Sequence, residues 1–363
     1  MAGRKTCFRL MACGLLFAFG ITVFSGKGAQ KQQDHVLVDR AWMDRANSPK
    51  YSLGHVHWIK SQTASEARRA NFNTSEVERI REWVAAYFNP DTDLTVQKSQ
   101  VYPGQRIKYE RERPGRSPRI ISQELYRLVP ESPLLQGKHF RSCAVVGNSG
   151  ILLGSRCGRQ IDSADFVFRC NLPFIEGFEN DVGTKSNFTT MNPSVLSHDY
   201  GIEGDTKNDT LREQFLKRLR LLHDQILHIP AFVSPKGYRN VETTNKMILQ
   251  YHFPIKVSYA PWDTIQKMSA LWNASGFHLN RPSTGSTLFA VAVCLCDQIH
   301  LYGFYPFSED RKGRKIKYHY YGHLKKRYLD SSHEMPEEYR AFQTLHQRKA
   351  LCREEIKRDQ AEL

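Results

Sequence analysis

Two apolar stretches of this chain, each associated with a loop of small and amide side chains, place the strongest constraint on its fold. Residues 144–147 are apolar and lead into an Asn-Ser-Gly sequence at 148–150, and residues 299–303 form a second apolar stretch preceded by a Pro-Ser-Thr-Gly sequence at 282–285. Buried strands beside such loops are how α/β folds present a nucleotide at strand ends. The glycine spacing is not that of a dinucleotide-binding fingerprint, and no Gly-Lys-Ser/Thr follows a glycine-rich turn. The sequence therefore lacks the main motif that would indicate a Rossmann dehydrogenase or an ATPase.

Apolar runs and helical spacings alternate along the chain. Strands are predicted at 144–147, 166–170, 226–232, 256–260 and 299–303, and helices at 76–88, 121–128, 211–223, 241–251 and 284–296. This alternation predicts an α/β fold, a mainly parallel sheet with helices on both faces. A length of 363 residues is compatible with one catalytic domain and an N-terminal anchor.

The N-terminus has the pattern of a membrane anchor. Arg4, Lys5 and Arg9 precede an apolar run at 10–24, which is short for a bilayer span, so a signal-peptide core is the alternative. The anchor is favoured because no small-x-small cleavage site directly follows the run. Basic residues before the run keep the N-terminus cytosolic. We therefore expect a cytosolic tail at 1–9, a transmembrane signal anchor at 10–26, a stem at 27–75 and a luminal catalytic domain at 76–363.

Glycosylation and cysteine patterns agree with a luminal body. Proline-free sequons begin at Asn73, Asn187, Asn208 and Asn273. Six of the eight cysteines lie beyond the anchor, where a luminal compartment would let them pair. The chain has no Cys-x-x-Cys pair, and the Cys-Leu-Cys sequence at 294–296 is too tight for the usual structural zinc site, so we expect no structural metal.

The chain is strongly basic, with a formal net charge of +15. Such a charge suits DNA, anionic membranes or acidic glycans, and a solvated basic face accounts for part of it. Lys and Arg cluster at 106–119 and at 311–317. Because a luminal protein meets no genomic DNA, we expect no nucleic-acid partner, and instead a sugar-nucleotide donor and an acidic sugar acceptor.

Four motifs occur in the order found in the animal sialyltransferases, and the chain resembles that family from about residue 140 to 346. The large motif begins at Cys143, the small one at Arg281, the third is Tyr-His-Tyr-Tyr at 318–321, and the last is His-Glu-Met-Pro-Glu at 333–337. Four segments look most like the α-2,8-sialyltransferases: 145–152 and 300–304, which lie within the large and small motifs, and 181–185 and 191–194.

The resemblance implies a single-domain, Rossmann-like glycosyltransferase fold, a GT-A-like variant, that uses CMP-sialic acid and neither a metal nor another cofactor. By position it implies contacts to nucleotide and phosphate from Asn148, Ser149, Asn171 and Asn192, and contacts to the sugar carboxylate and nearby groups from Ser283, Thr284 and Gly285. The residues alone leave open that Asn148 and Asn171 are turn residues and that Ser283 and Thr284 cap a helix. Capping and anion binding are compatible, because a helix N-terminus favours an anion.

The resemblance also assigns the chemistry to two histidines. His333 is implied to be the base that removes the proton of the acceptor hydroxyl. His319 is implied to hydrogen-bond the departing phosphate and offset its charge. A single histidine is more commonly a packed or surface residue, and His300, in the strand predicted at 299–303, is expected to be one of these.

Two positions depart from the family pattern. Relatives commonly have Trp where this chain has Tyr305, and we expect this change to tune the donor pocket. Relatives also commonly have an acidic residue where this chain has Gly322, and this change puts the positioning of His319 in doubt. The resemblance further implies disulfides between Cys143 and Cys296 and between Cys157 and Cys352. Cys170 and Cys294 are then expected to be free and buried.

These patterns predict a type II Golgi membrane enzyme that inverts the donor linkage as it transfers sialic acid to a terminal sialic acid of a glycoprotein or ganglioside. Two alternatives remain open: transfer to galactose or N-acetylgalactosamine, and a catalytically silent glycan-binding member. The basic stretch at 106–119 could follow an anionic glycan or be a solvated loop. Oligomerisation is possible.

Overall fold

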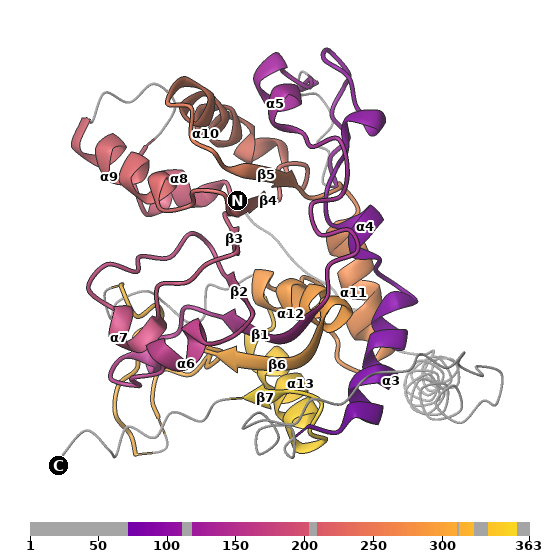
Figure 1. Cartoon of the computed structure of the whole chain (residues 1–363), viewed down its shortest axis with the longest axis vertical. Helices are drawn as coiled ribbons and strands as arrows, with labels where there is room; N and C mark the ends of the chain where they lie inside the picture. Colours follow the sequence, from indigo (N-terminus) through magenta and orange to yellow (C-terminus); the bar gives the residue numbers. More distant parts are fainter. Residues whose placement is uncertain (1–71, 111–117, 203–208, 311, 323–332, 354–363) are drawn as a thin grey trace, which may run out of the picture. The chain divides into compact units, whose positions relative to one another are not determined.

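The computed structural model describes residues 72–110, 118–202, 209–310, 312–322 and 333–353. In these residues seven strands form one sheet in which all neighbouring strands are parallel, in the order β5-β4-β3-β2-β1-β6-β7 (Figure 1). The strands are β1 (Phe140–Val146), β2 (Phe166–Arg169), β3 (Phe188–Thr190), β4 (Ile226–Ile229), β5 (Lys256–Tyr259), β6 (Cys296–Tyr302) and β7 (Cys352–Arg353). The predicted α/β fold with a parallel sheet is confirmed.

Helices connect these strands, and their labels follow Figure 1. The α-helices are α3 (Thr74–Ala85), α4 (Pro90–Asp93), α5 (Gln123–Leu128), α6 (Gly158–Asp162), α7 (Glu179–Val182), α8 (Ser194–His198), α9 (Asp209–Arg220), α10 (Tyr238–Gln250), α11 (Thr264–Ala274), α12 (Thr284–Leu295) and α13 (Met335–Gln347). Short 3₁₀ turns occupy Lys98–Gln100, Gly150–Leu152 and Pro235–Gly237.

Both faces of the sheet are covered, because successive strand residues point to opposite sides. On β1, Cys143 and Val145 belong to one hydrophobic cluster with α3, α11, α12 and α13. Ala144 and Val146 belong to another with Ile161 of α6 and Val182 of α7. Nearly continuous burial of β1 and β2 is the pattern of a two-sided parallel sheet. The prediction of helices on both faces is confirmed.

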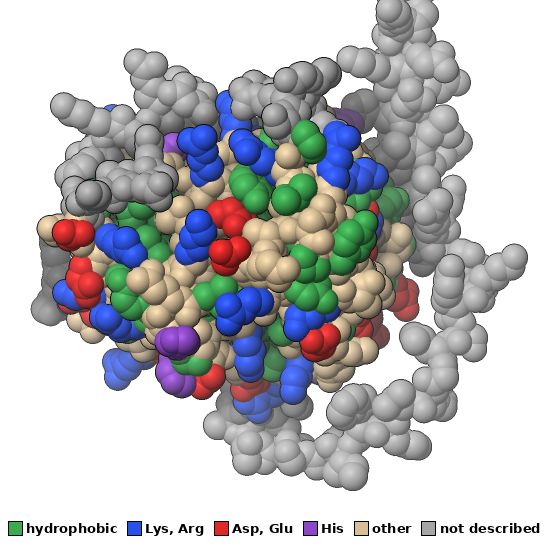
Figure 2. Space-filling model, turned by 90° about the horizontal axis from the view of Figure 1, so that it is seen from above, with side chains coloured by type: hydrophobic (Ala, Val, Ile, Leu, Met, Phe, Trp, Pro, Cys, Tyr) green, Lys and Arg blue, Asp and Glu red, His purple; other side chains and the backbone are tan. Residues whose placement is uncertain are grey.

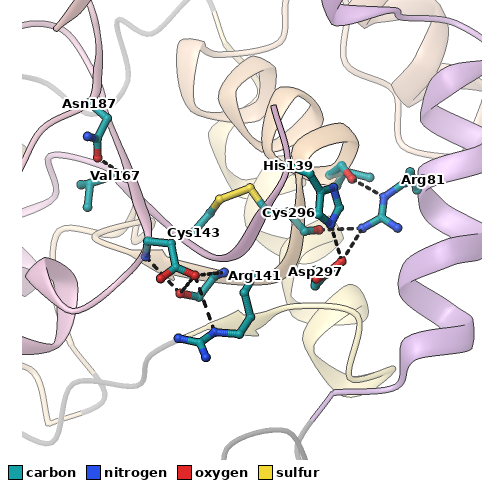
Figure 3. The surroundings of a disulfide bond; sticks show 11 residues. Arg81, His139, Arg141, Cys143, Val167, Asn187, Cys296 and Asp297 are labelled. Atoms are coloured by element: carbon teal, nitrogen blue, oxygen red, sulfur yellow. Dashed lines mark hydrogen bonds and ion pairs between the residues drawn. A yellow bond between two sulfur atoms is a disulfide. The ribbon is translucent and has the colours of Figure 1, made fainter. Parts of the chain in front are cut away.

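Helix α12 is the most apolar element and lies against the centre of the sheet. Its buried residues include Leu288 to Val293 without interruption, and it contacts α3 on one side and β1 and β6 on the other. A disulfide between Cys143 of β1 and Cys296, the first residue of β6, links neighbouring strands beside this helix (Figure 3). The structure thus contains the pairing that the resemblance implies.

The second implied disulfide is not formed. In the described residues Cys157 and Cys352 are not bonded to each other. Cys157 directly precedes α6, and its thiol lies 3.6 Å from the Ser155 carbonyl oxygen, while Cys352 pairs with His300 at the β7 edge of the sheet. Cys170 is a buried free thiol, as expected, whereas the free thiol of Cys294 is only partly buried.

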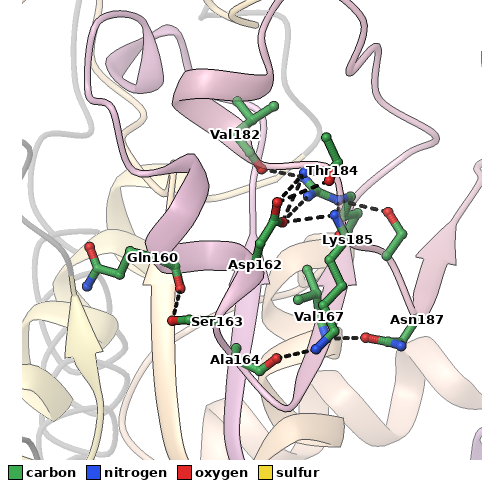
Figure 4. A network of polar contacts seen from close by, with 11 residues as sticks. Gln160, Asp162, Ser163, Ala164, Val167, Val182, Thr184, Lys185 and Asn187 are labelled. Atoms are coloured by element: carbon green, nitrogen blue, oxygen red, sulfur yellow. Dashed lines mark hydrogen bonds and ion pairs between the residues drawn. The ribbon is translucent and has the colours of Figure 1, made fainter.

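Asp162 holds a loop in place at the end of α6. Its carboxylate accepts hydrogen bonds from the backbone N–H groups of Thr184 and Lys185, each at 2.9 Å, and from the Thr184 hydroxyl (Figure 4). The nearby Asp165 accepts from the Ser142 N–H at 3.0 Å. Both carboxylates therefore support turns.

Sequence patterns located five strands and five helices and missed both short and long elements. The predicted helices at 76–88, 121–128, 211–223, 241–251 and 284–296 correspond to α3, α5, α9, α10 and α12. Strands β3 and β7, with three and two residues, were not predicted, nor were α11 and α13. His300 on β6 makes an edge-to-face contact with Phe72, so it is a packed residue as expected.

Several predictions concern residues that the structure does not describe. The tail at 1–9, the anchor at 10–26, the stem up to residue 71 and the sequon at Asn208 lie outside the described residues. No helix among the residues described is long and apolar enough to cross a membrane. Of the other sequons, Asn73 is exposed and caps α3, while Asn187 and Asn273 are partly buried.

Candidate active site

The order of the strands creates a crevice between β1 and β6. The chain proceeds from β1 through β2, β3 and β4 to β5 on one side and then returns to place β6 on the other side of β1. At such a reversal of strand order, α/β folds bind ligands at the carboxyl ends of the two central strands. The loops that follow β1 and β6 are the two segments that the sequence singled out.

These two loops touch each other through backbone atoms. The Gly147 N–H donates to the Tyr302 carbonyl at 2.7 Å, and the Ser149 N–H donates to the Gly303 carbonyl at 3.1 Å. Gly303 has a φ of +72°, and a Cβ atom there would lie 2.8 Å from the Gly147 carbonyl oxygen. Glycine is required because any larger residue would force the loops apart.

A cavity of about 850 Å³ opens at these strand ends. The structure brings to it all ten residues predicted to bind the donor substrate or to act in catalysis. They are Asn148, Ser149, Asn171, Asn192, Ser283, Thr284, Gly285, Tyr305, His319 and His333. Their presence in one cavity leaves their individual roles as predictions.

The asparagines on one wall of the cavity form a turn and leave one buried oxygen that can accept a hydrogen bond from a ligand. The Asn148 side chain donates to the Cys170 carbonyl at 2.9 Å, while its buried Oδ1 has no hydrogen-bond partner in the described residues. Asn171 adopts a left-handed φ of +58°, and its Oδ1 accepts from the Asn192 N–H at 3.3 Å. The turn interpretation therefore holds for Asn171, and Asn148 Oδ1 remains as a buried acceptor for a ligand N–H or O–H.

The N-terminus of α12 forms a second wall. The Ser283 Oγ accepts from the Ser286 N–H at 3.2 Å, which is the predicted cap. Thr284 and Gly285 follow in the first turn, and a Cβ on Gly285 would lie 2.4 Å from the Phe304 ring, so a larger residue there would require that ring to move. The exposed N–H groups and the helix dipole make this end of α12 favourable for an anion.

Glu338 supports this wall and was missed by the sequence prediction. Its two carboxylate oxygens accept from the Ser283 N–H at 2.7 Å and from the Ser283 hydroxyl at 2.6 Å. Burial raises the pKa of Glu338 to about 7, against the lowering effect of the Ser283 hydrogen bonds. A sequence signal existed, because Glu338 stands on the face of α13 that buries Ala341, Phe342 and Leu345.

His333 is held in one tautomer. Its Nδ1 lies 2.8 Å from the Arg281 carbonyl oxygen, which can only accept, so Nδ1 carries the hydrogen and Nε2 carries the lone pair. Burial lowers the pKa of His333, which favours the neutral ring at neutral pH. A neutral imidazole with a fixed Nε2 lone pair can accept a proton from a hydroxyl.

The third motif is attached to the loop after β1. The Tyr320 N–H donates to the Asn148 carbonyl at 2.9 Å, and the Tyr320 hydroxyl donates to the Phe174 carbonyl at 2.6 Å inside the core. His319 lines the cavity with its ring 5.1 Å from that of Tyr321. At the divergent Gly322, the N–H donates to the His319 carbonyl at 3.0 Å and an added Cβ would meet no atom closer than 3.5 Å. Glycine at 322 is therefore not required sterically and leaves His319 at the cavity.

Comparison with known proteins now decides the family. A family model described as glycosyltransferase family 29 (sialyltransferase) matches residues 90–350. The human protein alpha-2,8-sialyltransferase 8E is 34% identical over 281 residues, which cover 77% of this chain and 72% of that protein. The chain belongs to glycosyltransferase family 29, the sialyltransferases. It is therefore a glycosyltransferase.

Two solved structures are also similar to this chain. One is a mammalian sialyltransferase, with a TM-score of 0.49, 22% identity, and coverage of 75% of this chain and 93% of that one. The other is a mammalian sialyltransferase in complex with Gal-beta-1-3GalNAc-ortho-nitrophenol, with a TM-score of 0.47, 22% identity, and coverage of 75% and 94%.

The cavity of this sialyltransferase has further walls that sequence reasoning did not assign. His198 and Asp199 contribute from the end of α8, and Phe307 and Tyr339 contribute from the loop after β6 and from α13. No Lys or Arg of the described residues lines the cavity. On the face drawn in Figure 2, Lys and Arg are interspersed with acidic and hydrophobic side chains. Within the described residues, no group of three or more His, Cys, Asp or Glu side chains could hold a metal ion.

Proposed function

We propose that this sialyltransferase transfers sialic acid from CMP-sialic acid to the terminal sialic acid of a glycoprotein or ganglioside glycan, in α-2,8 linkage. The observation that carries the proposal is the hydrogen bond from His333 Nδ1 to the Arg281 carbonyl, which prepares Nε2 as a base in the cavity that also contains the asparagines and the N-terminus of α12. The 34% identity to a human α-2,8-sialyltransferase supports the linkage.

The reaction requires one bond to form as another breaks. The acceptor oxygen attacks the anomeric carbon of the sialic acid while its proton passes to Nε2 of His333. The bond from that carbon to the phosphate oxygen breaks on the opposite face, so the configuration inverts and CMP departs with the bonding electrons. His319 donates a hydrogen bond to the departing phosphate and offsets its charge.

The two polar walls of the cavity bind different parts of the donor substrate. Asn148 Oδ1, Ser149, Asn171 and Asn192 offer both acceptors and donors to the nucleotide and phosphate. Ser283, Thr284 and Gly285, at the positive end of α12, bind the sugar carboxylate. These contacts come from protein groups, so we propose that no metal or other cofactor takes part.

The same proposal includes a location. The basic and apolar pattern of residues 1–26 supports a type II anchor in the Golgi membrane, with the catalytic body in the lumen. The lowered pKa of His333 suits a mildly acidic compartment, because the base stays neutral there.

One assay tests this function. The purified full-length protein is given CMP-sialic acid and a panel of glycans that end in sialic acid, galactose or N-acetylgalactosamine, and mass spectrometry with linkage analysis reads the products. We expect transfer to the sialylated acceptors with an α-2,8 product. Transfer only to galactose or N-acetylgalactosamine would contradict the linkage, and donor binding without transfer to any member would indicate a silent glycan-binding protein.

A further inference from the structure

Three aromatic side chains that line the cavity contact one another at its mouth. The rings of Phe307 and Tyr339 lie 5.0 Å apart, those of Tyr305 and Phe307 5.2 Å apart, and those of Tyr305 and Tyr339 5.8 Å apart, all edge to face. We call Tyr305, Phe307 and Tyr339 the aromatic mouth. Phe307 is 38% exposed, and of the five large hydrophobic side chains found exposed in the described residues it is the one that lines the cavity.

Polar and cation–π contacts hold two of the three residues of the aromatic mouth. The Tyr305 hydroxyl donates to the Glu309 carbonyl at 2.8 Å, Glu309 and Lys315 form an antiparallel bridge, and Asp310 pairs with Arg314 at 2.7 Å. The guanidinium of Arg353 on β7 lies 4.6 Å from the centre of the Tyr339 ring. A preformed surface loses little conformational entropy when a ligand covers it.

Sheet order separates the aromatic mouth from the asparagine wall. Asn171 and Asn192 follow β2 and β3, on one side of β1, whereas Phe307 follows β6, on the other side. Tyr339 lies on α13, which begins two residues after His333. The aromatic mouth therefore lies on the β6 side of β1 and includes a residue of the helix that follows His333.

We propose that Phe307 and Tyr339 of the aromatic mouth, beside the Tyr305 that is predicted for the donor pocket, form the subsite for the neutral hexose that precedes the terminal sugar of the acceptor. The terminal sugar must place its hydroxyl at His333, so the next sugar extends toward solvent, where Phe307 is the exposed ring. Phe307 has no hydrogen-bond donor for a carboxylate, whereas the C–H face of a galactose-like ring needs only apolar contact. This inference rests on the proposed transfer to a glycan end.

Kinetics with a short and a long acceptor test the subsite. The full-length protein and its Phe307→Ala and Phe307→Tyr variants are assayed with the methyl glycoside of sialic acid and with sialyllactose, which adds galactose and glucose. We expect Phe307→Ala to raise the KM for sialyllactose about five- to tenfold more than the KM for the methyl glycoside, and Phe307→Tyr to restore it. Tyr102→Ala is the matched control, because Tyr102 is 64% exposed and does not line the cavity.

Three kinetic outcomes overturn the inference: equal losses with both acceptors, no loss with either, or a larger rise in the KM for CMP-sialic acid. If the wild-type protein transfers sialic acid to neither sialoside, the proposed function fails. A measurement of lactose binding then still tests the subsite. In saturation-transfer NMR with lactose as the probe, the C–H protons of the galactose ring should receive the strongest signal in the wild type and lose it in Phe307→Ala. Absence of that signal in the wild type contradicts the inference.

Discussion

Two carboxylates in this molecule each hold a distant loop by its backbone, yet only one of them stands in the cavity. Asp162 accepts from Thr184 and Lys185, and Glu338 accepts from Ser283. The Asp162 side chain is 31% exposed and does not line the cavity, whereas Glu338 is 3% exposed and does. The same hydrogen-bond pattern therefore supports a turn in one place and a candidate substrate site in the other.

The difference lies in what each carboxylate connects. Asp162 joins the end of α6 to a loop on the same side of the sheet. Glu338 joins α13, which begins beside His333, to Ser283 at the N-terminus of α12. Arg281, whose carbonyl orients His333, lies two residues before Ser283. A change at Glu338 should thus reach both the base and the anion-binding helix end, and a change at Asp162 should reach neither.

The largest effect is expected from removing the base on the Glu338 side. His333→Ala should lower kcat by about 10²- to 10⁴-fold, because general-base catalysis supplies about that much, while CMP binding and the melting temperature stay near wild type. Steady-state kinetics and calorimetric CMP binding measure these quantities. His300→Ala is the control, since His300 packs on β6 away from the cavity lining. Retention of more than about a tenth of wild-type kcat in His333→Ala would place the base elsewhere.

Glu338→Gln should have the next largest effect on transfer. A glutamine side chain replaces one of the two oxygens that accept from Ser283 with an NH2 donor, so one of these hydrogen bonds is lost as it stands. At pH 8, where Glu338 is ionised, loss of a hydrogen bond to this charged group costs about 1.5 to 3 kcal/mol, which corresponds to roughly a ten- to hundredfold fall in kcat/KM if Ser283 shifts. Asp162→Asn, measured in the same assay, should change kcat/KM less than about threefold. Equal losses of kcat/KM in the two variants would contradict the proposed difference between Glu338 and Asp162.

The part of the structure that the sequence could predict depends on how far apart along the chain the contacting residues are. The α/β alternation, the small-residue loops and the four ordered motifs led to the sheet, to helix α12 and to ten residues that line one cavity. The contact between Glu338 and Ser283 spans 55 positions, and no local spacing encodes it. Strand β3, with three residues, is too short for a period-two pattern to be distinct, although its fully buried neighbours on β2 and β4 require it.

The raised pKa of Glu338 also predicts a pH dependence of stability. The pKa is 4.5 in its ordinary environment and about 7 in the folded protein, so the folded state binds more protons between these values. Its stabilising contribution is complete below pH 4.5 and is lost as the pH rises through 7. Between pH 5 and pH 8 the wild type should lose on the order of 2 to 3 kcal/mol more unfolding free energy than Glu338→Gln. Denaturant unfolding at both pH values measures the difference, and parallel losses would contradict the assignment.

A smaller change is expected in the stability of Asp162→Asn. Asparagine keeps one oxygen to accept from the loop at Thr184 and Lys185 but removes the negative charge that lies 3.9 Å from the buried Arg169 guanidinium. We expect the free energy of unfolding to fall by about 1 to 2 kcal/mol. Asp165→Asn is a suitable comparison, because Asp165 supports a different turn through Ser142. A loss of transfer activity in Asp162→Asn at unchanged stability would show that Asp162 belongs to the functional site after all.

The smallest expected effect is that of metal removal. Asp162 and Glu338 already accept hydrogen bonds from protein groups, and the proposed contacts to the phosphate come from amides, hydroxyls, His319 and the N-terminus of α12. Cations such as Mn²⁺ and Mg²⁺ bind to carboxylate and phosphate oxygens, and here protein donors take that place. Transfer should therefore proceed at the wild-type rate after exhaustive EDTA treatment, with or without Mn²⁺ added back. A rate that vanishes with EDTA and returns with Mn²⁺ would mean that a carboxylate of the cavity, Glu338 foremost, binds a metal during the reaction.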